Sequence, residues 1–151
     1  MTITIRSFQL GDFDILLDLA NQAAPFALDE NKEWLEYRKA FDESQRMRHH
    51  YIAEENDRPV GYGCLEQQSD DPRWLRVFVV CHPLKLPEVG SKLYDQLLKK
   101  AKEVSATHIW AREYQEDQPI SEFFKERGFV ETKRFRLPDQ RPMVVFRLDL
   151  V

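Results

Sequence analysis

Residues 74–104 read WLRVFVVCHPLKLPEVGSKLYDQLLKKAKEV, and this stretch decides the fold. Its first part, Trp74 to Cys81, is almost entirely apolar, which predicts a central strand covered on both faces. From Glu88 to about Val104, apolar residues recur every three or four positions and predict an amphipathic helix. The residues of this apolar stripe are Val89, Leu93, Leu97, Ala101 and Val104. A strand followed directly by a long helix is typical of an α/β protein.

The segments on either side of this unit alternate between strand and helix patterns. The turn Asn56-Asp57-Arg58-Pro59 separates two strand-like runs and predicts a hairpin. Gly128 follows a short helical run, at the position that favours left-handed backbone. The other expected elements are strands at residues 3–6, 50–55, 60–67, 108–112, 129–137 and 143–150, and helices at residues 13–20, 33–41 and 120–127. This order predicts one α/β domain over residues 1–151, built around a mixed sheet.

Composition and charge argue against several classes of protein. Lys and Arg total 22 and Asp and Glu total 26, so the net charge is −4, which disfavours non-specific nucleic-acid binding. No apolar run approaches the ~18 residues of a membrane span, and the first residues lack a signal-peptide pattern. Cys64 and Cys81 alone indicate neither a zinc site nor a disulfide scaffold. We therefore expect a cytoplasmic protein that holds no metal and binds neither nucleic acid nor membrane.

The junction between the central strand and the long helix is a candidate anion site. A strand that runs into a helix N-terminus presents free backbone N–H groups and the positive end of the helix dipole, which together favour phosphate. Gly90 would allow a ligand close to the backbone, and Lys85, Ser91 and Lys92 could add donors or charge. An ordinary strand-to-helix connection is the alternative, because a proline and an acid are normal at a helix start.

A second segment, Ile120 to Phe129, predicts a short amphipathic helix, a glycine stop and a strand. Its adjacent phenylalanines, Phe123 and Phe124, are most simply core residues. The segment is informative because of its place, one strand after the long helix.

The order of elements together with these two segments resembles the GNAT family of N-acetyltransferases, over nearly the whole chain. The stretch from Phe124 to Phe129 resembles that family's Tyr-x-x-x-Gly-Phe segment. The stretch from Lys85 to Gly90 lies where the family has Arg/Gln-x-x-Gly-x-Gly/Ala, the loop that holds the pyrophosphate of acetyl-CoA. The resemblance implies a central mixed, mostly antiparallel sheet flanked by about four helices. Its fourth and fifth strands, 78–81 and 109–112 here, would be parallel and would splay apart around the pantetheine arm.

The chain also departs from the family pattern at defined positions. Lys85 replaces the usual Arg or Gln, Glu88 stands where the first Gly is expected, and the stretch before Gly90 is one residue short. A carboxylate ~4 Å from a phosphate would cost about 1 kcal/mol in water and ~4 at an effective dielectric of 20. Phe124 stands where the family often has a Tyr that protonates the leaving thiolate, and Asp117 stands where an Asn often contacts the pantetheine arm.

The resemblance implies acetyl-CoA as cosubstrate and assigns it a set of contacts. The expected cofactor-binding residues are Val80, Cys81, Lys85, Leu86, Glu88, Val89, Gly90, Ser91, Lys92, Asp117, Phe123 and Phe124.

The chemistry implied is direct attack of a primary amine on the thioester carbonyl. A backbone N–H at the end of the central strand could stabilise the oxyanion. A base must take the amine proton, and Glu66, Glu113 and His82 are the candidates. Because Phe124 has no hydroxyl, Tyr114, Tyr94 or water would protonate the departing thiolate.

The acceptor is a small molecule or a peptide amine, and the sequence does not choose between them. Trp34, Tyr37 and Phe41, with Phe26 before them, could form an acceptor pocket or could be core. The acids Asp29, Glu30, Glu33 and Glu36 could attract a cationic amine or could be a solvated helix face. By analogy with the family, residues 143–150 could pair with a second copy in a homodimer.

Two other functions remain open at this point. The altered loop and Phe124 could leave a catalytically degenerate binding or interaction module of the same fold. The unusual loop could also accommodate a longer or different acyl donor.

Overall fold

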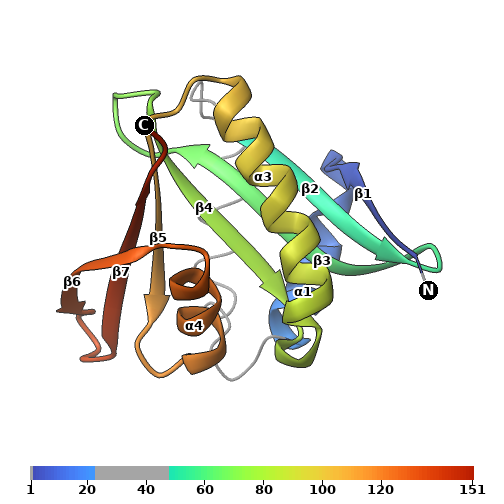
Figure 1. The fold of residues 1–151 in the computed structure, drawn as a ribbon. Helices are drawn as coiled ribbons and strands as arrows, with labels where there is room; N and C mark the ends of the chain where they lie inside the picture. Colours follow the sequence, from blue (N-terminus) through green and yellow to red (C-terminus); the bar gives the residue numbers. More distant parts are fainter. Residues whose placement is uncertain (1, 23–47) are drawn as a thin grey trace.

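Strand β4 (Trp74–Cys81) lies at the centre of a seven-stranded sheet, as its apolar sequence predicts (Figure 1). The structure is a computed structural model that describes residues 2–22 and 48–151. The strand order is β1-β2-β3-β4-β5-β7-β6, and every neighbouring pair is antiparallel except β4 and β5. The predicted mixed, mostly antiparallel sheet is therefore confirmed. The other strands are β1 (Ile3–Ser7), β2 (Arg48–Glu55), β3 (Arg58–Gln67), β5 (His108–Tyr114), β6 (Val130–Arg136) and β7 (Pro142–Asp149).

Helices pack on both faces of this sheet. Those of the described chain are α1 (Phe13–Gln22), α3 (Ser91–Glu103) and α4 (Gln118–Glu126). Figure 1 shows α3 running across β2, β3 and β4, with α4 on the same face. Leu93 and Leu97 of α3 are fully buried in the core of that face. On the other face, Leu16 and Leu19 of α1 pack against Tyr62. None of the described helices is long and apolar enough to span a membrane.

The parallel pairing between β4 and β5 is short and lies only at the start of the two strands. Its register joins Trp74 with His108, Leu75 with Ile109, and Arg76 with Trp110. Beyond these three pairs the strands separate, and their arrowheads point in different directions in Figure 1. The splay that the resemblance implies is thus present, and it opens toward the carboxyl ends of both strands.

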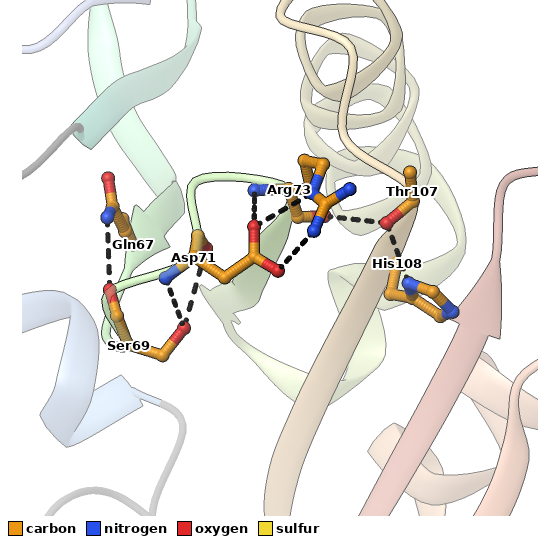
Figure 2. Close-up of polar contacts among 6 residues, drawn as sticks. All are labelled: Gln67, Ser69, Asp71, Arg73, Thr107 and His108. Carbon is orange, nitrogen blue, oxygen red and sulfur yellow. Dashed lines mark hydrogen bonds and ion pairs between the residues drawn. The ribbon is translucent and has the colours of Figure 1, made fainter.

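The closed end of the splay is held by one carbonyl group. The Arg73 carbonyl accepts hydrogen bonds from the N–H groups of Thr107 and His108, at 2.9 and 3.1 Å, and from Thr107 Oγ1 at 3.4 Å. Figure 2 shows this contact and the bond of 2.8 Å between Thr107 Oγ1 and His108 Nδ1. The Trp74 and His108 rings then stack with centroids 4.0 Å apart. The starts of β4 and β5 are therefore joined before the strands diverge.

The loop before β4 is ordered by its own polar side chains. The Asp71 carboxylate accepts from Arg73 Nε at 3.0 Å, from Arg73 Nη2 at 3.1 Å and from the Arg73 N–H at 2.9 Å. Ser69 Oγ accepts from the Asp71 N–H, and Gln67 Nε2 donates to the Ser69 carbonyl (Figure 2). These bonds fix the backbone of Arg73, whose carbonyl holds β5.

Most predicted elements are confirmed, with shifts at their ends. β4 has the predicted bounds, and Gly128 has the predicted left-handed backbone, with φ +90°. Only Asn56 and Asp57 form the hairpin turn, both with positive φ, because β3 already begins at Arg58. The long helix was predicted to start at Glu88, but α3 starts at Ser91. The predicted helix at residues 33–41 lies outside the described residues, and the single-domain boundary at 1–151 stays a prediction.

Close packing of α3 on β3 depends on a glycine. A Cβ atom at Gly61 would lie 2.6 Å from Val89 Cγ1 and 2.9 Å from Leu93 Cδ1. Neither atom can move freely, because both side chains are fully buried. The helix therefore approaches the sheet at this point only because residue 61 has no side chain.

We expect Gly61→Ala to lower the free energy of unfolding by ~1–3 kcal/mol, the usual cost of overpacking a core. Urea unfolding curves measure this change. Gly11→Ala is the matched control, because a Cβ there meets nothing within 4 Å. It should change stability by no more than about 0.5 kcal/mol. Equal effects of the two substitutions would show that the contact at Gly61 is not limiting.

Candidate active site

The splay between β4 and β5 places unpaired backbone at the centre of the sheet. Past Arg76 and Trp110, neither strand has a ladder partner in the other within the described chain. Val80 and Cys81 end β4 and are buried, with 7% and 5% of their surfaces exposed. Backbone polar groups in such a position are costly to leave unmade, so the slot is suited to a ligand that supplies hydrogen bonds along an extended arm.

The segment that follows β4 is helical, not an open loop. Residues 83–85 form a tight turn and residues 86–90 a wider π-type turn that leads into α3. His82 Nδ1 accepts from the Leu84 N–H at 3.1 Å, and the His82 carbonyl accepts from the Lys85 N–H at 2.8 Å. The Leu86 N–H donates to the Pro83 carbonyl. The expectation of free N–H groups here is therefore corrected for these three amides, which are used within the turns.

The predicted polar side chains of this segment bond to their own protein. Lys85 Nζ lies 3.6 Å from Glu55 Oε1, and Lys92 Nζ donates to the Ile3 carbonyl at 3.2 Å. Ser91 Oγ accepts from Arg127 Nη2 at 2.6 Å. Each would have to exchange or share a partner in order to bind a phosphate.

Glu88 and Gly90 differ in their surroundings. Glu88 is exposed, so its carboxylate faces solvent. Gly90 is buried, and a Cβ there would lie 2.7 Å from Leu86 Cδ1 and 3.4 Å from Phe123 Cε2. Its small size thus serves packing within the protein. Leu86 and Val89 are buried in the same core.

Arg127 is a functional candidate that the sequence reasoning missed. Its guanidinium carbon lies 3.5 Å from the centroid of the Phe123 ring, and Nη1 donates to the Phe123 carbonyl at 3.1 Å. With its bond to Ser91, it joins the end of α4 to the start of α3. Arg127 lies within the stretch from Phe124 to Phe129 that resembles the family, directly before Gly128. Its contact with Ser91 depends on the fold, so the sequence alone did not indicate it.

Cys81 is a buried thiol at the end of β4. Burial raises the pKa of Cys81 to about 12, although the Gly90 N–H donates to its sulfur. His82 follows on the exposed turn, with Nδ1 held as a hydrogen-bond acceptor. The two side chains therefore lie in different environments.

Glu113 lies on the separated part of β5 and has the most perturbed carboxyl of the predicted bases. Its Oε1 is buried and has no hydrogen-bond partner in the described structure. Desolvation raises the pKa of Glu113 to about 8, against the opposing charge of Arg76. A base is most effective when its pKa lies near the working pH, so Glu113 has the properties that a general base needs.

The other predicted bases and acids are engaged elsewhere. Glu66 is buried and accepts from Arg48 Nε at 3.0 Å and from Gln68 Nε2 at 2.5 Å. Tyr94 is buried between α3 and α4, and burial raises its pKa to about 12. Tyr114 is half-buried at the end of β5, with the Arg141 guanidinium carbon 4.9 Å from its ring centroid.

Helix α4 begins beside the open end of the splay. Asp117 Oδ1 caps it by accepting from the Ile120 N–H at 3.3 Å, and burial raises the pKa of Asp117. Phe124 is fully buried, with ring centroids 4.9 Å from Phe129 and 6.3 Å from Phe146. Phe124 is therefore a core residue, which is the simpler of the two interpretations of its sequence.

The structure thus brings together some predicted site residues and separates others. Cys81 at the end of β4, Glu113 on the separated part of β5 and Asp117 at the start of α4 all lie toward the open end of the splay. Glu66 lies opposite Arg76, at the closed end. Trp34, Tyr37, Phe41, Phe26 and the neighbouring acids lie outside the described residues. Within the residues that are described, no three His, Cys, Asp or Glu side chains form a metal site.

Comparison with known proteins agrees with this geometry. The acetyltransferase (GNAT) family matches residues 13–129, so the chain belongs to this family. Membership makes the protein an acetyltransferase. No curated protein matches the sequence.

Solved structures show the same fold at low sequence identity. An N-acetyltransferase from Staphylococcus aureus Mu50 superposes with a TM-score of 0.78 at 14% identity, covering 100% of both chains. The protein yncA from Salmonella typhimurium, solved with its cofactor acetyl-CoA, has a TM-score of 0.73 at 17% identity and covers 100% of this chain and 95% of its own. A ribosomal-protein-alanine N-acetyltransferase from Brucella melitensis has a TM-score of 0.72 at 19% identity, with 97% and 99% covered.

The raised pKa of Glu113 predicts a pH-dependent stability. The folded protein keeps a proton on Glu113 up to about pH 8, whereas the unfolded chain releases it near its ordinary pKa of 4.5. The contribution of this group is therefore fully present below pH 4.5, and it falls by at most ~1.4 kcal/mol per pH unit as pH rises to about 8. Glu113→Gln should remove this slope in urea unfolding curves. The exposed control Glu116→Gln should keep it, and a slope retained in Glu113→Gln would refute the shift.

Proposed function

We propose that this protein transfers the acetyl group of acetyl-CoA to a primary amine, by direct attack of the amine on the thioester. The observation that carries the proposal is the early end of the β4–β5 pairing. It leaves a slot between two parallel strands, directly before the turns that lead into α3. Membership in the acetyltransferase family supplies the reaction class.

The residues around the slot fit acetyl-CoA at its thioester end. Val80 and Cys81 line the slot through their backbone, and Asp117 stands at its open end. When bound, acetyl-CoA supplies an activated acetyl group. A β4 backbone N–H directed toward β5 is positioned to stabilise developing negative charge, since it has no partner in β5. Burial and, to a smaller extent, the negative charge of Asp117 raise the pKa of Glu113, so a proton can be held on Glu113 at this end of the slot.

Glu113 is proposed as the general base. Its orphaned Oε1 would accept the ammonium proton, directly or through one water. Tyr114, the next residue of the strand, or water would return a proton to the thiolate. Glu66 is less suited, because Arg48 and Gln68 already occupy its oxygens. Tyr94 and Phe124 are held within the core.

The diphosphate end of the site is the weaker fit. The turns at residues 83–90 leave exposed Glu88 near the start of α3, and Lys85 is paired with Glu55. Arg127 and Ser91 are the proposed additional contacts, because they form a polar link beside the same helix start. The neighbour yncA, solved with its cofactor acetyl-CoA, supports acetyl-CoA as the ligand of this fold.

The proposal that the acceptor is an amine is supported in part by similar proteins. The Brucella protein is by its name an N-acetyltransferase for an alanine of a ribosomal protein, which supports an amine nucleophile in this fold. A small molecule and a peptide amine are both compatible with the slot. A longer acyl donor stays a prediction, as do the homodimer and the cytoplasmic location.

The deciding experiment combines binding and turnover. A thermal shift with acetyl-CoA should appear, about 2.7 kcal/mol of stabilisation at 100 times the Kd, and CoA release should rise when a panel of primary amines is added. Binding without release from any amine would favour the non-catalytic module. If acetyl-CoA does not bind and no amine causes CoA release, the proposal is overturned.

The Glu88 carboxylate should weaken binding of the diphosphate. We expect Glu88→Gln to tighten CoA binding a few-fold, since removing one like charge at short range is worth ~1 kcal/mol. Isothermal titration calorimetry at low and high salt measures this. Glu103→Gln is the control, because Glu103 lies at the far end of α3, about 20 Å from the turn that holds Glu88 and beyond the screening length. Weaker binding in Glu88→Gln would mean that Glu88 supports the turn.

The base assignment predicts a change in the pH profile. Glu113→Gln should lower kcat by about 10²-fold or more, the usual contribution of a general base, and should abolish the fall in rate that follows protonation of Glu113 below its pKa of about 8. Glu66→Gln serves as the matched comparison among the buried carboxyls. An unchanged pH profile in Glu113→Gln, or a greater loss in Glu66→Gln, would contradict the assignment.

A further inference from the structure

A pocket on the sheet face opposite α4 has chemistry that the proposed reaction leaves unused. It has a volume of about 340 Å³ and lies over β5, β6 and β7, beside the start of β4. Strand alternation separates the two faces: Ile109 and Ala111 belong to the core under α4, whereas Trp110 and Arg112 point to the pocket. Its size falls in the range of small-molecule sites.

The pocket offers a broad apolar surface. Trp74, Trp110, Phe135 and Val145 line it. Both tryptophans are fixed by their neighbours, since Trp74 stacks on His108 at 4.0 Å and the Arg76 guanidinium carbon lies 5.8 Å from the Trp110 ring centroid. Flat rings held in place favour an aromatic or aliphatic group of a ligand.

The polar part of the lining is cationic. Arg112, Lys133 and Arg147 contribute side chains, and no acidic side chain is among the described residues of the lining. Asp149 is half exposed and forms an ion pair with Arg147, with 2.9 Å between Oδ1 and Nε. Lys133 is exposed, with Nζ 5.8 Å from the Phe135 ring centroid. Arginine and lysine in one apolar concavity favour a carboxylate or another compact anion.

The pocket also begins where the splay opens. Trp110 is the last β5 residue that pairs with β4, and Arg112 lies on the separated part of the strand. The Arg112 end of the pocket therefore borders the start of the slot in which the proposed transfer takes place, whereas Trp74 and Trp110 lie where β4 and β5 are still paired. The amine of a molecule seated in the pocket can approach the slot while its other groups stay on the aromatic and cationic lining.

We propose that this pocket binds the acceptor, and that the acceptor is a primary amine carrying a carboxylate and an apolar or aromatic group, as an amino acid does. This inference rests on the proposed function. The apolar group packs on Trp74 and Trp110, and the carboxylate bonds to Lys133 and Arg147. The α-amine then faces the splay.

The test compares matched ligands that differ only in charge. L-Phenylalanine and L-phenylalaninamide share a ring and an amine, but only the first carries a carboxylate. We expect kcat/KM, corrected for the free-amine fraction of each acceptor, to favour the acid about tenfold or more, the usual effect of a charge-assisted hydrogen bond. Lys133→Gln/Arg147→Gln should remove this preference. Lys102→Gln, exposed on α3, is the control for lost charge.

A binding measurement separates this inference from the proposed function. N-Acetyl-L-phenylalanine has no reactive amine, so calorimetric titration with it and with its amide reports on the pocket alone. Selective binding of the acid that is lost in Lys133→Gln/Arg147→Gln supports the pocket even if no amine is acetylated, in which case the proposed function fails. Acetylation that favours the amide, or equal binding of acid and amide, overturns the inference while the function stands. Absence of binding and of any preference among acetylated amines also overturns it.

Discussion

The short parallel contact between β4 and β5 is the constraint on which the rest of the structure depends. Three residue pairs and the Arg73 carbonyl join the two strands at one end. Beyond these pairs no ladder joins β4 to β5 within the described chain. Strands β1 to β4 form the first half of the sheet, on which α1 and α3 pack. Strands β5, β7 and β6 form the second half, on which α4 packs (Figure 1). The slot is therefore the seam between the two halves.

The charges around this seam are divided between its two faces. On the α3 side, Lys85 and Lys92 bond to β1 and β2 groups, and Glu88 is exposed. On the opposite face, cationic side chains line an aromatic pocket. Glu113 alternates with Arg112 on β5 and so shares the α4 side with Ile109 and Ala111, with a buried oxygen that has no partner in the described chain. The proposed base therefore lies beside the seam, and the two faces differ in the side chains that they present to a ligand.

Local sequence patterns predicted the elements of the fold well, because apolar periodicity and turn residues act within a few positions. β4 was predicted to the residue, and Gly128 has the left-handed backbone that its place after a helix predicted. The site was less accessible to such patterns. Tertiary contacts decide that residues 83–90 form helical turns. They also decide that Lys85 pairs with Glu55. The pocket could not be predicted, since its lining comes from four strands whose order in the sheet is not their order in the chain.

Hydrogen–deuterium exchange with and without acetyl-CoA tests the central claim, that the separated parts of β4 and β5 hold the cosubstrate. Amides within residues 77–81 and 111–114 should exchange more slowly when acetyl-CoA is bound. Amides at 74–76 and 108–110 should be unchanged, because they already pair with each other. Saturating acetyl-CoA that protects other segments and leaves 77–81 and 111–114 unchanged would contradict the account.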